Sequence, residues 1–175
     1  MSSQPSRGLR DHPALRFRAG IVLGIGLGAF VDGIIFHQVL RWHHFISDTA
    51  GNDTSTVDGL NSNTLADGLF HVASWLILVA GLIMMWRSAR AGEVPSGRVL
   101  AGSLLTGGAL FNLFDAIASH WILGLHHIHE GSYETLSDVI YFVVSLLIGL
   151  AGLALARSGQ SRERALSAAS AGSAS

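Results

Sequence analysis

Aspartate and histidine occur in this sequence in a pattern that is repeated. The first copy is Asp32-x4-His37-x5-His43-His44, and the second, 83 residues further on, is Asp115-x4-His120-x5-His126-His127. Each copy begins inside a long apolar run and finishes where that run ends. An acid and a histidine are costly inside a segment of hydrocarbon length, so such residues are usually functional. Recurrence of the whole pattern therefore predicts a functional site rather than an accident.

The chemistry that these side chains suit is metal binding. Their donor atoms are imidazole nitrogens and carboxylate oxygens, and the chain has no cysteine. This set favours a transition metal ion, with Zn or Cu(II) preferred and Fe also compatible. The seven expected metal ligands are His37, His44, His71, His120, His127, Asp32 and Asp115. The additional candidates are His43, His126, His129, Asp67 and Glu130. Whether the protein is an enzyme is left open by the sequence.

Four apolar runs position these residues. The chain is 49% hydrophobic and only 13% charged, which indicates a membrane protein. Spans are expected at about 19–41, 65–86, 99–123 and 136–156, each long enough to cross a bilayer. The prediction is an all-α integral membrane four-helix bundle over 19–156. A cytoplasmic segment, 1–18, precedes it, and a disordered cytoplasmic tail, 157–175, follows it.

The arginines orient the predicted bundle. All eleven basic residues are arginine, and ten lie in the N-terminal segment, the link between the second and third spans, or the C-terminal tail. The positive-inside rule then places both termini in the cytoplasm and both histidine-bearing loops outside. No basic cluster is dense enough to predict nucleic-acid binding. The expected partners are the lipid bilayer and a metal ion, and homo-oligomerisation stays open.

The repeat extends beyond the acid and histidine pattern. Gly24 matches Gly107 at the same offset of 83, and residues 64–67 match residues 135–138 at an offset of 71. This indicates two tandem helix hairpins, which are parallel repeats related by an axis along the membrane normal. Such an axis makes the two copies face each other in the outer half of the bundle. Facing helices in bundle cores hold metals in this way.

Simpler structural roles compete with metal binding at several positions. Asp67 and Asp138 each follow a threonine at the spacing of a capping box, which predicts a role at a helix start. In a continuous helix His37 and His44 share a face, whereas His71 could equally be a hydrogen-bonded core residue. The histidines near the interface can also be simply solvated. The glycines at 20, 24 and 28 predict a small-residue packing stripe.

Several motifs together resemble a known family. They are Asp32-Gly33-Ile34-Ile35-Phe36-His37-Gln38, Trp42-His43-His44, Asp67-Gly68-Leu69-Phe70-His71, and Phe111-Asn112-Leu113-Phe114-Asp115 with His120 and His126-His127. Over about residues 19–156 the chain is similar to a bacterial family of small, histidine-rich, four-span integral membrane proteins of unknown function. The resemblance implies a multi-pass protein of the bacterial cytoplasmic membrane and marks the same histidines and acids. It implies no activity.

Three other functions compete with metal handling. The first is a non-haem metal oxidoreductase acting on a lipid or quinone, which paired histidines favour although their spacing differs from that of the membrane di-iron enzymes. The second is a bis-histidine haem protein with His37 and His120 as axial ligands, which the flanking carboxylates disfavour. The third is a proton-coupled transporter that uses Asp32 and Asp115.

Overall fold

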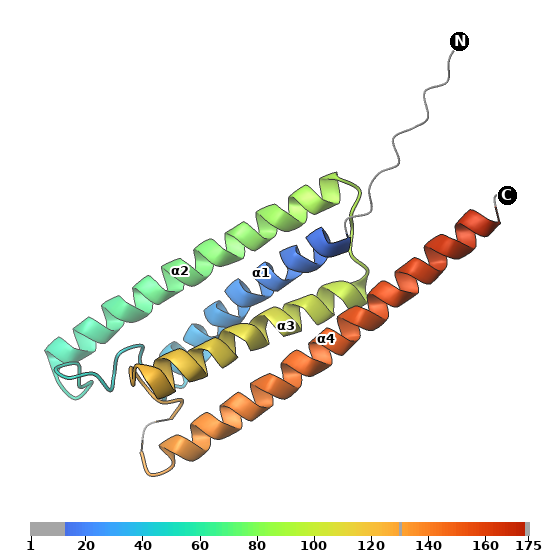
Figure 1. Cartoon of the computed structure of the whole chain (residues 1–175). Helices are drawn as coiled ribbons and strands as arrows, with labels where there is room; N and C mark the ends of the chain where they lie inside the picture. The colour runs from blue at the N-terminus through green and yellow to red at the C-terminus, as the bar shows by residue number, and fades with distance from the viewer. Residues whose placement is uncertain (1–12, 130, 174–175) are drawn as a thin grey trace.

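Four long helices make up the protein (Figure 1). The computed structural model describes residues 13–129 and 131–173, and these contain no strand. The helices are α1 (Pro13–Asp32), which continues as the π-helix η1 (Gly33–Val39); α2 (Val57–Arg90); α3 (Gly97–Asp115), which continues as the π-helix η2 (Ala116–Ile122); and α4 (Glu134–Gly172). All four are long and apolar enough to cross a membrane. The predicted all-α bundle of four spans is confirmed.

The helices are arranged with α1 and α3 in the middle. α2 packs on α1, and α4 packs on α3. Both histidine-bearing loops lie at one end of the bundle, and the link between α2 and α3 lies at the other end (Figure 1). This topology brings η1, η2 and the two loops together.

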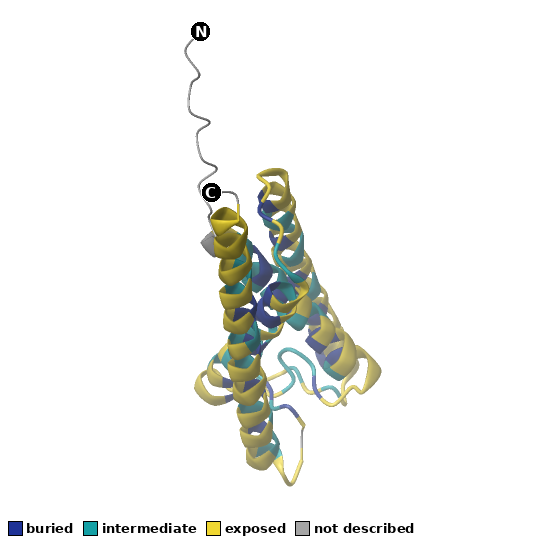
Figure 2. Ribbon diagram, turned by 90° about the vertical axis from the view of Figure 1, so that its right-hand side faces the viewer, coloured by how far each residue is buried: buried dark blue, intermediate teal, exposed yellow. Residues whose placement is uncertain are grey.

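Burial follows the pattern of a membrane protein. Most buried residues are small or polar, such as Ala19, Ala109 and Ser145, whereas most large apolar side chains, such as Leu69 and Leu147, are exposed. Figure 2 shows exposed residues along the outer faces of the helices. Lipid tails are as apolar as leucine, so large side chains gain little by leaving them. Helices in a membrane therefore pack through small residues.

Glycines bring α1 and α3 into close contact. A Cβ atom added to Gly28 would lie 2.7 Å from the Cα of Gly108, and one added to Gly24 would lie 3.0 Å from the Cα of Gly107. A larger residue at either position would push the helices apart. The predicted packing stripe is therefore confirmed, and it serves contact within the chain.

The second and fourth helices begin earlier than their predicted spans. Thr56 caps α2, because its hydroxyl accepts a hydrogen bond of 3.1 Å from the amide of Gly59. Asp67 therefore lies in the third turn of α2, and Asp138 lies beyond the first turn of α4. The capping interpretation of both acids is wrong, since neither stands at a helix start.

The C-terminal segment does not match the predicted disordered tail. α4 continues to Gly172 without a break. This part of the sequence is rich in alanine, which favours helix. Glu163 also fixes it to the bundle, because its carboxylate lies 2.8 Å from the guanidinium of Arg16 and accepts a 2.8 Å hydrogen bond from the amide of Ser96. Most of the predicted N-terminal segment, residues 1–12, lies outside the described residues.

Candidate metal centre

Each repeated pattern places its acid at the junction of an α-helix and a π-helix. Asp32 ends α1 before η1, and Asp115 ends α3 before η2. A π-helix joins residues five apart by hydrogen bonds, so an acid and a histidine five apart come to the same side. In an α-helix, at about 100° per residue, the same two residues would point about 140° apart. The π-helices therefore bring Asp32 toward His37, and Asp115 toward His120.

A left-handed residue follows each π-helix. Arg41 has a φ of 51° and Gly124 a φ of 56°, at equivalent positions 83 residues apart. This conformation turns the chain sharply, so that His43 and His126 return to the end of the bundle. For a residue other than glycine it costs about 1–2 kcal/mol. The helix does not continue to His44, because η1 ends at Val39. The shared face that a continuous helix would give His37 and His44 therefore does not form.

Two groups of potential metal ligands result. One contains Asp32, His37 and His43, the other contains Asp115, His120 and His126, and within each group the ligand atoms lie within 4.8 Å of one another. All six residues are buried.

The spacing within the second group is close to that of a metal site. Oδ2 of Asp115 lies 3.3 Å from Nε2 of His120 and 3.7 Å from Nε2 of His126. In the first group, Oδ2 of Asp32 lies 3.9 Å from Nε2 of His37. A tetrahedral ion with bonds of about 2.1 Å holds its ligand atoms roughly 3.4 Å apart. Both groups therefore have dimensions that suit one ion each.

The histidines at 37 and 120 are oriented by carboxylates of the neighbouring helices. Nδ1 of His37 lies 2.8 Å from Oδ1 of Asp67, and Nδ1 of His120 lies 2.7 Å from Oδ1 of Asp138. A carboxylate accepts, so each Nδ1 carries a hydrogen, and in the neutral imidazole Nε2 then keeps a lone pair. Histidines that bind metals usually donate their other N–H to a carboxylate or carbonyl in this way.

The histidines at 43 and 126 are oriented by backbone carbonyls of the opposite half. His43 donates from Nδ1 to the carbonyl of Ile128 at 2.9 Å, and His126 donates to the carbonyl of Phe45 at 3.0 Å. The Nε2 atoms of His43, His126 and His120 are buried and have no hydrogen-bond partner among the described residues. Buried polar atoms are nearly always paired, so three unpaired nitrogens in one cluster call for a ligand.

Asp67 and Asp138 also tie the loops to the helices. Besides His37, Asp67 accepts from the amide of Phe45 at 2.9 Å and from Nδ1 of His44 at 2.6 Å. Asp138 accepts the corresponding bonds of the other half, from the amide of Ile128 at 2.9 Å and from Nδ1 of His127 at 2.6 Å. Both acids therefore position a histidine of the centre and the loop beyond it.

Four histidines of the predicted set lie outside the two groups. His44 and His127 are partly exposed and are bound to the orienting acids. His71 donates to the carbonyl of Asp67 at 2.8 Å and packs on Gly33, and His129 packs edge-on against Trp42. Glu130 lies outside the described residues. The structure thus gathers the predicted Asp32, Asp115, His37 and His120 with two of the additional candidates, His43 and His126.

The chain matches, over residues 19–159, the model of a family described as "Predicted membrane protein (DUF2243)". The chain belongs to this family. The resemblance seen in the sequence is confirmed, and the match includes every residue of the two groups. No curated protein and no solved structure matches the chain.

Tyr141 is a residue of the site that the sequence analysis did not identify. Its hydroxyl donates to Oδ1 of Asp32 at 3.0 Å, and its ring stacks on His120. The residue at the equivalent position in α2, 71 residues earlier, is Phe70, which stacks on His37. At this position the two halves therefore have aromatic rings of similar shape that differ by one hydroxyl. The match of Phe70 to Tyr141 at the offset of 71 is the signal that could have revealed it.

Burial keeps His43 neutral. This residue lies in the loop beyond η1, and burial lowers its pKa to about 2, with further lowering by the neighbouring His126 and His37. Neutral imidazole is the form that binds a metal ion.

Proposed function

We propose that this protein is an integral membrane metal protein that holds two transition metal ions, one in each group. The observation that carries the proposal is the orientation of four buried imidazoles. Each directs Nδ1 to an oxygen acceptor, which leaves Nε2 for an ion beside a carboxylate. Two neighbouring ions would also offset the charge of the two acids, which is costly in hydrocarbon.

A purely structural hydrogen-bond network is the main competing explanation. In such a network His120 would donate from both nitrogens, to Asp138 and to Asp115. This arrangement still leaves Nε2 of His43 and of His126 buried without a hydrogen bond to any described residue, with Asp115 3.7 Å from Nε2 of His126. Metal binding satisfies all of these atoms together, so it is the better supported explanation.

The ligand set of each group narrows the class of metal site. Two histidines and one carboxylate, without sulfur, hold Zn in hydrolytic enzymes and Fe(II) in non-haem oxygenases. Cu(II), which the sequence also favours, accepts nitrogen and oxygen ligands as well. Three protein ligands leave coordination positions open for water or substrate. The set therefore supports metal exchange or metal-dependent chemistry more than a closed structural role.

The proposed membrane orientation places the centre on the outer side. Arg87, Arg90 and Arg98 lie at the ends of α2 and α3 that are remote from η2 and the histidine-bearing loops. By the positive-inside rule this remote end is cytoplasmic, and so are both termini. The centre then opens toward the extracytoplasmic side of the bacterial cytoplasmic membrane.

The geometry gives less support to a haem protein. The rings of His43 and His126 are stacked 4.5 Å apart, and each lies less than 5 Å from the next histidine, His37 or His120. Four imidazoles packed so closely leave no slot for a porphyrin between His37 and His120. A proton-coupled transporter remains the other alternative, and it needs no bound metal.

Elemental analysis of the detergent-purified protein tests the proposal. We expect about two metal ions per chain, one for each three-ligand group. His37→Ala and His120→Ala should each lower the bound metal, whereas His129→Ala, a histidine of the same region outside both groups, should retain it. Full metal content in both span variants, or no metal in the native protein, would overturn the proposal.

A further inference from the structure

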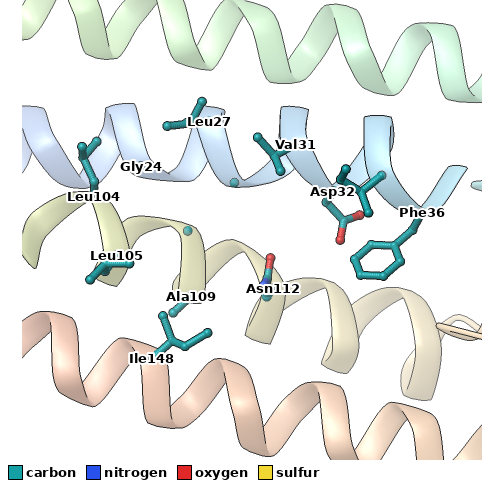
Figure 3. Close-up of a pocket in the computed structure, with 13 residues that line it drawn as sticks. Gly24, Leu27, Val31, Asp32, Phe36, Leu104, Leu105, Ala109, Asn112 and Ile148 are labelled. Atoms are coloured by element: carbon teal, nitrogen blue, oxygen red, sulfur yellow. The ribbon is translucent and has the colours of Figure 1, made fainter. Parts of the chain in front are cut away.

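A groove of about 440 Å³ runs between α1 and α3 and ends at the proposed centre (Figure 3). Gly28 and Gly108 lie along its floor, and Ile148 of α4 lies at its edge. Its rim on α1 includes Leu27 and Val31, whose side chains are 42% and 48% exposed. These residues belong to the membrane-spanning segment. The groove therefore opens sideways to hydrocarbon rather than to water.

The end of the groove nearest the centre is polar. The carboxylate of Asp32 and the side-chain amide of Asn112 project into the space between α1 and α3 (Figure 3). No hydrogen bond joins the Asn112 side chain to any residue that the structure describes, although Asn112 lies inside a span. An unpaired amide at this depth is unfavourable, because lipid offers it no partner.

The amide is not part of the repeated pattern. The residue equivalent to Asn112 in the first half, 83 residues earlier, is Ala29. A role in holding the repeated fold therefore does not explain Asn112. Its placement in the groove beside Asp32 points to a ligand with a polar group at one end.

We infer that this groove binds a lipid-soluble aromatic alcohol of the hydroquinone type, with its hydroxyl head at Asn112 and Asp32 and its hydrocarbon tail along the glycine floor. The inference rests on the proposed function, and it names the substrate class of the same centre. Asp32 belongs both to the first metal group and to the groove wall, so a head bound there lies beside the metal site.

The walls of the groove select this occupant. Oδ1 of Asp32 accepts from Tyr141 and has a lone pair for a second hydrogen bond, and the amide of Asn112 both donates and accepts, so together they suit a hydroxyl group. The ring of Phe36 lies next to Asp32 and offers an aromatic surface to a flat head (Figure 3). A volume of about 440 Å³ lies within the range of small-molecule pockets.

Two other occupants fit less well. A lipid acyl chain would fill the apolar part but leave the amide of Asn112 unpaired. A helix from a second copy would need the small-residue stripe for close approach, and α3 already occupies that stripe through Gly107 and Gly108. The hydroquinone-type molecule is the occupant that satisfies both the apolar and the polar parts.

Photocrosslinking to the purified, metal-loaded protein in lipid nanodiscs tests the inference. The probe is a decyl hydroquinone with a diazirine on its chain, and the matched control is the same diazirine-bearing chain without the head. We expect the head-bearing probe to label peptides of α1 and α3 that line the groove, and untagged decyl hydroquinone to compete. Asn112→Leu should weaken binding about fivefold, the effect of one hydrogen bond.

A matched pair of tryptophan variants separates the groove from the rest of the lipid-facing surface. Val31→Trp fills the rim and should abolish labelling. Val72→Trp introduces the same ring at a valine of similar exposure on α2, 55% against 48%, and should leave labelling unchanged. Metal content is measured on every sample, so that failure of the metal centre and failure of the groove are seen separately.

Each of the other possible outcomes contradicts binding of a hydroquinone-type molecule in the groove. Equal labelling by the headless probe would mean that an acyl chain occupies it. Crosslinks between copies would mean that the face joins two chains. Labelling that survives Val31→Trp would place the probe elsewhere. Any of these results with metal retained overturns this inference and leaves the metal proposal standing, whereas absence of metal in the native protein overturns the metal proposal.

Discussion

The imidazole rings of His43 and His126 lie parallel, with centroids 4.5 Å apart and 2° between their planes. Each ring donates its Nδ1 hydrogen to a backbone carbonyl of the opposite half, at Ile128 or Phe45. The orientation of one histidine in each group therefore depends on the loop of the other half. This exchange of hydrogen bonds makes the two halves depend on each other, and both rings are buried.

Acid should destabilise the metal-free protein through His43. Its pKa is about 2 in the folded protein and near 6.5 when unfolded, so between these values protons bind preferentially to the unfolded chain. The contribution of neutral His43 to stability is complete above pH 6.5 and decreases progressively as the pH falls. Thermal unfolding of chelator-treated protein in detergent measures this dependence. In His43→Gln the stability should decrease less steeply as the pH falls. Equal slopes of melting temperature against pH in the native protein and the variant would show that His43 is not the responsible group.

The orienting acids should control metal affinity. Asp67→Asn and Asp138→Asn keep the shape of the side chain but remove the charge that holds His37 or His120. We expect each change to lower metal affinity about 10–100-fold, as is usual for partners of metal-binding histidines. Asp58→Asn, at an exposed acid in the first turn of α2, is the control. Competition with a metal-sensitive dye measures the affinity. If all three variants bind metal like the native protein, Asp67 and Asp138 serve the fold alone.

The sequence predicted the four helices and the central residues of the candidate site from simple patterns. Span length and hydropathy are sufficient for the helices, and the offset of 83 identified Asp32 and Asp115 with their histidines. The offset of 71 also related Asp67 to Asp138. The capping-box spacing led to a wrong role for both acids, because the residues that precede them continue the helices.

The details that were missed depend on backbone conformation. A continuous α-helix would put His37 and His44 on one face, whereas the chain changes to a π-helix at Gly33 and turns at Arg41. Periodicity analysis assumes a constant rotation per residue, so it could not distinguish His43 from His44. The order of the C-terminal segment depends on a tertiary contact. The ion pair of Glu163 with Arg16 holds the end of α4 on the bundle, and local sequence could not identify Arg16 as the partner of Glu163.

The two left-handed residues should respond differently to substitution. Gly124→Ala places a Cβ atom in a left-handed conformation and should lower the free energy of unfolding by about 1–2 kcal/mol. Arg41→Gly relieves similar strain but adds freedom to the unfolded chain worth about 0.5–1 kcal/mol, so we expect a neutral or slightly stabilising effect. Unfolding in detergent with denaturant measures both. Destabilisation by Arg41→Gly greater than that by Gly124→Ala would mean that the Arg41 side chain itself is needed.

Labelling of single cysteines tests the proposed orientation. The native chain has no cysteine, so each introduced thiol is the only one present. Cysteine at Asp53 or His129, in the two loops at the site end, should react with a membrane-impermeant maleimide in intact cells. Cysteine at Val94, an exposed residue in the link between α2 and α3, should react only after the membrane is opened. The reverse pattern would place the centre on the cytoplasmic side.

Removing the charge of both central acids should separate metal binding from folding. Asp32→Asn/Asp115→Asn preserves the shape of the two side chains but removes the charges that face the ions. The variant should insert and fold, because a neutral amide is less costly in hydrocarbon than a carboxylate. It should lose metal by more than the roughly 10–100-fold drop in affinity expected for an orienting residue, since both acids belong to the ligand groups. Metal content and melting temperature are measured on the same preparation. A proton carrier predicts unchanged metal content and loss of pH-driven transport, so unaltered metal together with unaltered stability would exclude the two acids from a metal site.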